Sequence, residues 1–265
     1  YARLGLHWPP THPRIEAMEL REYTLCSAIA VPSRFVERSF QARRVNQALI
    51  QRNALGVNLN KFKPSSSPPL SPSLSGLKVI YAGSLSVRKG IPDLLKSFHS
   101  ADLPDSSLTL LGGDTPELKS LLARQPASVK RLGHRPQTEL VQHYQSAHCF
   151  VIASIEEGMA MVQMQALACG VPLICTSHTG GEDLLRLQGA SSSKNELGIE
   201  QFPAGFVVPI HRPDAIAHCL QRLQNETGLW ESMRKAALAL AGTELSWNAY
   251  GQRAIQHYRS LLNKR

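Results

Sequence analysis

Cysteines are few in this sequence, and their arrangement argues against a metal site. The five are odd in number, lie mostly in apolar runs and include no C-x-x-C pair (Cys26, Cys149, Cys169, Cys175 and Cys219). A structural zinc site requires closely spaced cysteines and histidines. We therefore expect no zinc, and we expect reduced, buried thiols of the kind found in a reducing compartment.

Long apolar runs and dense basic runs are also missing. No stretch approaches the roughly 18 residues of a transmembrane helix, and nothing at the start resembles a signal peptide. The chain starts at Tyr1, so we expect it to be a piece of a longer protein that lacks its front. The net charge is +9, but the basic residues are scattered and not interleaved with aromatics. This favours phosphates or a membrane surface as partners over nucleic acid.

A segment rich in serine and proline divides the chain. PSSSPPLSPSLSG occupies residues 64–76. Proline fixes φ and removes backbone donors, so we predict a linker that is extended where proline dominates. It would separate the end of an incomplete first domain (1–63) from a main domain (77–245). A C-terminal helix (246–265) would return toward the first domain.

The main domain alternates between short apolar segments and amphipathic segments. This alternation is typical of βαβ units and predicts an α/β fold, a Rossmann-like parallel sheet with helices on both faces. The predicted strands are 78–83, 107–113, 129–133, 148–154, 172–177 and 205–210, and the predicted helices are 89–101, 116–124, 138–147, 161–169, 213–224, 229–242 and 246–263. Thr138 and Ser246 are predicted N-caps, and the polar stretch 186–203 is predicted to be a mobile loop. Ligands bind at the carboxyl ends of such strands.

Two strand-to-helix turns carry candidate chemistry. GSLSVRKG (Gly83–Gly90) places Arg88 and Lys89 before a helix whose free N–H groups already favour anions. The turn is not a Walker loop, because the order G-x-x-x-x-G-K-[ST] is absent. From these residues alone it is either a diphosphate clamp or a solvated basic turn.

The second turn opens EEGMAMVQMQALACG, residues 156–170. Gly158 would let a ligand approach the backbone, and the N–H groups of residues 159–162 would face it from the start of a helix. Glu157 would accept hydrogen bonds from hydroxyl groups, and Gln165 would reach along the same helix. Gly170 is expected to end that helix at the C′ position.

Together these segments resemble the nucleotide-sugar-binding half of the family 4 retaining glycosyltransferases, whose two Rossmann-like domains face a cleft in the GT-B fold. The similarity covers nearly the whole chain. Its motifs follow in order as YAGSLSVRKG, LTLLGGD, VKRLGHRP, EEGMAMVQMQALACGVPLI, GFVVPIHRPDAIA and LSWNAYGQRAIQHYRSLL. Before the linker, IAVPSRFVERSF and ALGVNLNKFKP resemble the passage from the first domain to the second.

The resemblance implies roles for individual residues. Lys89 would neutralise the donor diphosphate and Glu157 would hold the sugar hydroxyls, so these two are the expected catalytic residues. Ser84 stands where the family often has an arginine, and Gln165 replaces the acid that takes the ribose hydroxyls. A neutral amide lacks the charge-assisted contact of a carboxylate, so we expect nucleotide binding weaker by roughly 1–2 kcal/mol. The full expected donor-binding set is Ser84, Arg88, Lys89, Arg135, Glu157, Met159, Ala160, Met161, Val162 and Gln165, with Arg135 against the nucleobase mainly through its backbone.

The resemblance also implies a reaction: transfer of a sugar from a nucleotide diphosphate sugar, with retention of configuration. It implies no cofactor and no metal, because cations and a helix dipole would take the charge and no D-x-D pair is present. The expected acceptor is a saccharide or a lipid-linked molecule. The expected location is the cytoplasm, at the inner face of the membrane with peripheral membrane association. We expect the piece alone to be inactive.

Two alternatives remain open. Ser84 and Gln165 would also suit a degenerate, non-catalytic relative that acts as a scaffold. A sugar-nucleotide epimerase of GT-B type has a similar architecture, although the EEG segment and the LSW tail fit transferases better.

Overall fold

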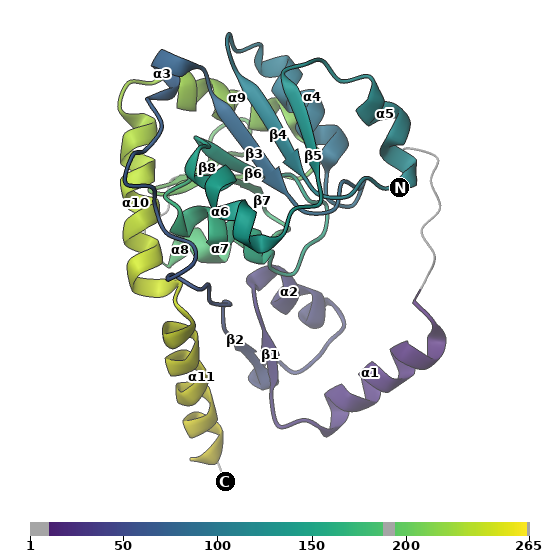
Figure 1. Ribbon diagram of the computed structural model, residues 1–265. Helices are drawn as coiled ribbons and strands as arrows, with labels where there is room; N and C mark the ends of the chain where they lie inside the picture. Colours follow the sequence, from purple (N-terminus) through teal and green to yellow (C-terminus); the bar gives the residue numbers. More distant parts are fainter. Residues whose placement is uncertain (1–10, 188–193, 264–265) are drawn as a thin grey trace.

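The computed structural model describes residues 11–187 and 194–263. Its main body is a seven-stranded sheet in the order β5-β4-β3-β6-β7-β9-β8, flanked by helices (Figure 1). Every neighbouring pair is parallel except β8 with β9. The strands are β3 (Lys78–Ala82), β4 (Ser107–Leu111), β5 (Val129–Gly133), β6 (Cys149–Ile152), β7 (Leu173–Thr176), β8 (Glu200–Phe202) and β9 (Gly205–Val208). The predicted α/β class and parallel sheet are confirmed.

Helices cover both faces of this sheet. α4 and α9 pack against each other on one face, and α6, α7 and α8 lie on the other, as right-handed crossovers require (Figure 1). α10 packs against α7. The bounds are α4 (Ile91–Ala101), a 3₁₀ turn η3 (Pro116–Leu118) continued by α5 (Lys119–Ala123), α6 (Gln137–Gln145), α7 (Met161–Ala168), α8 (Gly181–Arg186), α9 (Pro213–Asn225) and α10 (Leu229–Glu244).

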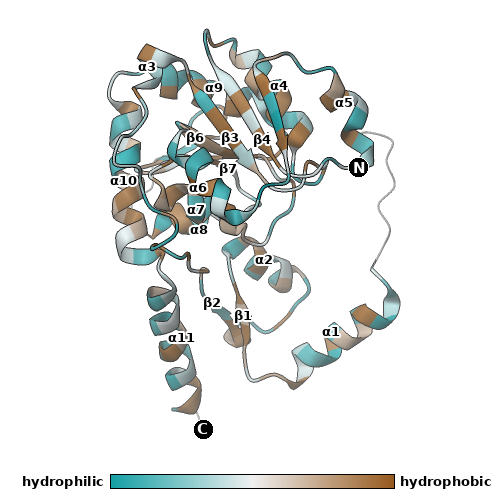
Figure 2. Cartoon of the chain, in the orientation of Figure 1, coloured by the Kyte–Doolittle hydropathy of each residue, from teal (hydrophilic) through white to brown (hydrophobic). Residues whose placement is uncertain are grey.

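The core lies between the sheet and these two helical layers. All residues of β6, β7 and β9 are buried, which explains why these strands are continuous apolar runs rather than alternating ones. Figure 2 shows the apolar colouring concentrated on the central strands. The four cysteines at positions 149, 169, 175 and 219 are buried free thiols here, and Cys26 is partly exposed, so the prediction of unpaired thiols is confirmed.

A smaller unit precedes the main body. It consists of α1 (Pro13–Leu25), β1 (Ile29–Val31), α2 (Arg34–Ala42), the 3₁₀ turn η2 (Gln47–Leu49) and β2 (Ile50–Arg52), and it is called the leading segment below. β1 and β2 form a parallel pair. Ser33 caps α2, because its hydroxyl accepts the N–H of Val36. α1 buries no residue.

The last helix, α11 (Trp247–Leu262), lies beside the chain that follows β2 (Figure 1). The Ser246 hydroxyl accepts the N–H of Ala249 at 3.0 Å, which confirms the predicted cap. The guanidinium of Arg253 donates to Asn53 Oδ1 and to the Ala54 carbonyl, both at 3.0 Å. These bonds hold α11 beside the chain that leaves β2.

Two local predictions were wrong. Thr138 is not an N-cap: α6 begins at Gln137, because Pro136 at the N-cap fixes φ at −64° and turns the chain earlier. The stretch 186–203 is not all loop, because residues 200–202 form β8 against β9. Residues 188–193 of that stretch lie outside the described residues.

The serine- and proline-rich segment is not uniformly extended. It contains one helical turn, α3 (Pro72–Ser75), and it is tied to the sheet by His148. The Lys78 N–H donates to His148 Nδ1 at 2.9 Å, so Nε2 carries the proton and donates to the Leu70 carbonyl at 2.8 Å. The domain boundaries drawn from the sequence stay a prediction.

Candidate functional site

The site lies where the strand order reverses. β3 and β6 are neighbours in the sheet. The strands that follow β3 are added on one side of this pair, and the strands that follow β6 are added on the other. Open α/β sheets leave a crevice at the point where the strand order reverses in this way. The turns that follow these two strands are bonded together: the Ile155 N–H donates to the Arg88 carbonyl at 2.9 Å, and the Arg88 guanidinium donates to the Glu156 carbonyl at 3.1 Å. The two turns therefore form one rim.

Lys89 and Glu157 face each other across this rim. The Lys89 ammonium forms an ion pair with Glu157 Oε2, and the two side chains are only 15% and 18% exposed. Burial, followed by the neighbouring Arg88 guanidinium, lowers the pKa of Lys89 to about 8. The carboxylate of Glu157 opposes this effect, because it favours the charged ammonium. Neutral pH lies below this pKa, so Lys89 carries its positive charge there.

The start of α7 faces the same space. Ala160 is the N-cap residue and provides no side-chain cap. Within the described residues, the N–H groups of Met161 and Val162 have no hydrogen-bond acceptor, whereas that of Gln163 donates to the Ala160 carbonyl. Free N–H groups at a helix start attract anions and hydroxyl oxygens.

These groups line one cavity of about 480 Å³, called the Lys89 cavity below. Nine of the ten predicted donor-binding residues line it: Ser84, Arg88, Lys89, Glu157, Met159, Ala160, Met161, Val162 and Gln165. The side chain of Arg135 does not line it; Arg135 is 41% exposed and pairs with Glu139 at 3.5 Å. The structure thus brings together residues from two turns that are about seventy positions apart in the sequence.

Other lining residues were not singled out in the sequence. Tyr81, Ala82, Gly83, Gln137, Leu140 and Ile152 complete the wall. Gln137 is the first residue of α6 and follows the turn at the end of β5. Its position after a strand end is the signal that could have marked it as a lining residue. Behind the wall, the buried Tyr144 hydroxyl donates to Gln165 Oε1 at 3.3 Å, a contact that no local pattern could reveal.

The leading segment and the chain that follows β2 hold the Glu157 loop from the other side. The Ser33 hydroxyl donates to the Gly158 carbonyl at 2.6 Å, and the Leu55 N–H donates to the Met159 sulfur at 3.4 Å. Glu157 donates its own N–H to the His178 carbonyl at 2.9 Å. The position of the carboxylate therefore depends on contacts far apart in the chain.

Two other features are absent from the described residues. No group of three or more histidine, cysteine, aspartate or glutamate side chains is placed to hold a metal ion. No helix in the same ranges is both long enough and apolar enough to cross a membrane.

Comparison with known proteins identifies the family. The model for the family described as glycosyl transferases group 1 matches residues 76–226, more than half of the chain, so the chain belongs to this family. It is 25% identical over 191 residues to the O-antigen chain mannosyltransferase B of Escherichia coli, covering 69% of this chain and 45% of that protein. It is 27% identical over 228 residues to a D-inositol 3-phosphate glycosyltransferase of Corynebacterium jeikeium, covering 78% and 50%. The chain spans about half the length of these relatives.

Solved structures agree on the architecture. A sucrose-phosphate synthase from Thermosynechococcus elongatus superposes with a TM-score of 0.72 at 22% identity, covering 94% of this chain and 63% of that one. HepE of Anabaena, crystallised with UDP-glucose, gives 0.68 at 17% identity, covering 89% and 64%. The expected resemblance to family 4 glycosyltransferases and the GT-B fold are confirmed.

Proposed function

We propose that this chain carries the donor-binding half of a glycosyltransferase that takes its sugar from a nucleotide diphosphate sugar. The observation that carries the proposal is the Lys89 cavity. It combines a charged lysine, a carboxylate and an uncapped helix start within one rim. Solved structures of similar fold hold UDP or UDP-glucose.

Each group in the cavity has a role in this proposal. Lys89 and the N–H groups of Met161 and Val162 take the negative charge that grows on the diphosphate as it leaves. Glu157 accepts hydrogen bonds from the sugar hydroxyls. Lys89 must exchange its contact with Glu157 for the diphosphate when the donor binds, so the ion pair is a feature of the free site.

The proposed reaction retains the configuration of the sugar. The bond between the anomeric carbon and the diphosphate oxygen breaks, and the acceptor oxygen bonds to the same face of that carbon. The acceptor proton passes to the departing diphosphate. We propose that neither metal nor cofactor takes part, since the charge is met by Lys89, Arg88 and the start of α7.

The acceptor and the setting are further parts of the proposal. A basic chain of net charge +9 in a family with O-antigen and inositol-phosphate transferases favours a saccharide or lipid-linked acceptor at the cytoplasmic face of a membrane. The acceptor-side domain is represented only by the leading segment. We therefore propose that this piece binds the donor without turning it over.

Calorimetric titration tests the proposal directly. UDP, GDP and ADP are titrated into the chain and into its Lys89→Ala form, with Lys96→Ala as the control because Lys96 is an exposed lysine on α4. We expect one of the three nucleoside diphosphates to bind. Its affinity should be at least tenfold lower for Lys89→Ala than for the unmodified chain, and unchanged for Lys96→Ala. Equal binding in all three proteins would contradict the clamp, and no binding even with the acceptor-side domain restored would favour a scaffold. Isomerised UDP-GlcNAc in that restored protein would favour the epimerase.

A further inference from the structure

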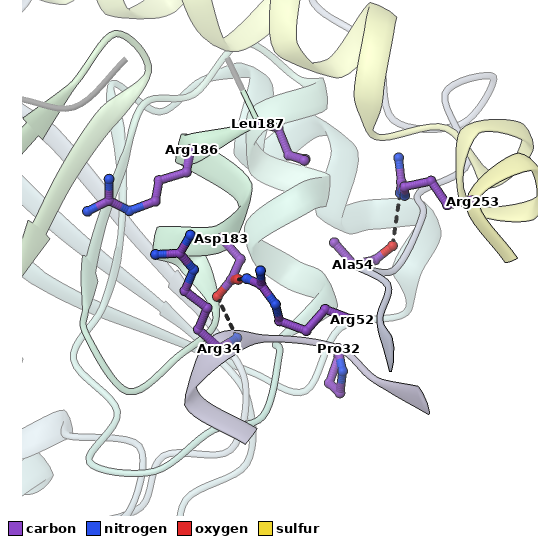
Figure 3. Close-up of a pocket in the computed structure, with 8 residues that line it drawn as sticks. All are labelled: Pro32, Arg34, Arg52, Ala54, Asp183, Arg186, Leu187 and Arg253. Atoms are coloured by element: carbon purple, nitrogen blue, oxygen red, sulfur yellow. Dashed lines mark hydrogen bonds and ion pairs between the residues drawn. The ribbon is translucent and has the colours of Figure 1, made fainter. Parts of the chain in front are cut away.

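A second cavity lies where the leading segment meets the main body. It has a volume of about 250 Å³ and shares no lining residue with the Lys89 cavity. Its wall holds four arginines from three parts of the chain (Figure 3). Arg34 and Arg52 come from the leading segment, Arg186 from α8 and Arg253 from α11. It is called the arginine cavity below.

One carboxylate lines the arginine cavity, and each of its two oxygens accepts a hydrogen bond. Asp183 accepts the backbone N–H of Arg34 at 3.0 Å and the Arg52 guanidinium at 3.1 Å. Arg52 also contacts Glu37 through Nε at 2.8 Å. Its remaining terminal nitrogen, Nη2, has no partner among the described residues.

The other two arginines differ in what they leave free. Arg253 makes a hydrogen bond with each of its three nitrogens. Arg186 uses Nε for Glu182 at 2.8 Å and Nη2 for Glu200 at 2.7 Å, which leaves Nη1 without a partner within the described ranges.

Arg34 is the unpaired charge of the cavity. Its guanidinium has no hydrogen bond and no ion pair in the part of the chain that the structure describes, and the residue is half-buried. In Figure 3 it stands on one side of Asp183, with Arg52 on the other. Asp183 is the nearest negative charge and interacts with Arg34 electrostatically, but its oxygens bond the Arg34 backbone and the Arg52 guanidinium instead of the Arg34 guanidinium. An anion from outside the chain would therefore give the half-buried guanidinium of Arg34 a direct hydrogen-bonding partner.

We propose that the arginine cavity binds the phosphoryl group of a small anionic ligand. Arg34 is its main contact, and Arg52 and Arg186 supply further N–H donors. A guanidinium matches phosphate oxygens in a planar fork, and a phosphoryl group has three terminal oxygens to share among the three side chains, whereas a carboxylate has two. The volume is below the usual range for drug-sized ligands, which points to inorganic phosphate or a small phosphate ester.

Such a ligand would join the leading segment to the main body. Arg34 follows Ser33, whose hydroxyl holds the Gly158 carbonyl next to Glu157. A bound phosphoryl group would therefore favour the arrangement in which the leading segment supports the Glu157 loop. This inference stands whether or not the chain transfers a sugar.

Titration of inorganic phosphate at constant ionic strength, with chloride as the balancing anion, tests the inference. We expect saturable binding by the unmodified chain, at least tenfold weaker in Arg34→Gln. Arg38→Gln is the matched control, because Arg38 is exposed on the same helix and does not line the cavity. A parallel titration with glycerol 3-phosphate distinguishes a phosphate ester from the free ion. The ligand that binds with the higher affinity identifies which of the two the cavity prefers.

Two outcomes would overturn the inference. One is the absence of saturable phosphate binding, or equal binding by Arg34→Gln and the unmodified chain. The other is binding that Lys89→Ala abolishes and Arg34→Gln preserves, since the phosphate would then lie in the Lys89 cavity. Melting temperatures without phosphate establish that Arg34→Gln is folded. Arg34→Lys keeps the positive charge and loses the planar guanidinium. Its affinity for phosphate is expected to lie between those of the unmodified chain and Arg34→Gln.

Discussion

Lys89 and Glu157 form an ion pair across the mouth of a cavity, although each belongs to a different strand-to-helix turn. The pair is mostly buried, and within the described residues Glu157 Oε2 has no other partner. Each charge is therefore satisfied by the other while the site is free. The site can exchange this contact for a ligand that carries both an anion and hydroxyl groups.

Breaking the pair from one side is expected to destabilise the fold. Lys89→Met leaves the Glu157 carboxylate buried without a partner, which costs about 1–3 kcal/mol of unfolding free energy. Adding Glu157→Gln is expected to recover much of that loss, because the amide tolerates burial better. Urea unfolding of the double-mutant cycle measures the coupling, with Lys96→Met as the control. The coupling between Lys89 and Glu157 would be contradicted if the double variant lost as much unfolding free energy as the two single variants lose together.

Donor binding is expected to weaken in alkaline solution. The pKa of Lys89 is lowered to about 8, so the ammonium that attracts the diphosphate is lost as the pH rises through that value. A bound anion raises this pKa, and binding should take up protons near pH 8–9. Affinity for the nucleoside diphosphate that binds is expected to fall about tenfold between pH 7.5 and 9.5. Calorimetry on Lys89→Arg, which stays charged, should show no such fall.

The identity of residue 165 is expected to set nucleotide affinity. In Gln165→Glu the carboxylate would accept from the Tyr144 hydroxyl and from a ribose diol, which strengthens binding by roughly 1–2 kcal/mol. The gain should be confined to ribonucleotides, so a 2′-deoxyribonucleoside diphosphate serves as the control ligand in the same titration. Equal gains for both sugars would show that position 165 does not face the ribose.

The buried His148 is expected to make the fold sensitive to acid. Burial lowers its pKa from 6.5 to about 4, despite the bond to the Leu70 carbonyl. The unfolded chain therefore binds a proton that the folded chain does not, and stability falls as the pH drops from 6.5 toward 4. The loss is about 3 kcal/mol by linkage. Urea unfolding at pH 7.5 and 4.5 should show a smaller loss in His148→Gln, since carboxylates affect both proteins alike.

Gly90 is expected to tolerate no side chain. It has φ of +69°, and a Cβ would collide with the carbonyl group of Ala153. Gly90→Ala should therefore lower the melting temperature and displace Lys89, which precedes it. Gly113→Ala is the control, because a Cβ there meets nothing within 4 Å. Similar melting temperatures for the two variants would contradict the collision.

Much of the fold was predictable from short-range pattern. Buried parallel strands are continuous apolar runs, which is why β3, β6 and β7 stood out in the sequence. β8 did not, because a three-residue edge strand has no pattern of its own and forms only against β9. α6 was misplaced by one residue because Pro136 set its start in place of Thr138.

Part of the candidate site could also be predicted from the sequence. Lys89 and Glu157 could be singled out because parallel strands place their following turns on one edge of a sheet. Tyr144 behind Gln165 could not, because that contact joins α6 to α7 across 21 positions. Arg135 stands on the surface with Glu139, and its proposed contact with a base rests on the resemblance alone.

The sequence by itself determined the order of most strands and helices in the main body, since hydrophobic periodicity and turn chemistry act over a few neighbouring residues. Together with the family resemblance, it also determined nine of the residues that line the Lys89 cavity. Only the tertiary structure decided that Lys89 pairs with Glu157, that Tyr144 lies behind Gln165, and that the guanidinium of Arg34 lines an arginine cavity without a hydrogen bond to any described residue. Ion pairing and burial depend on distances between distant segments. Those distances exist only after the sheet and its helices have packed.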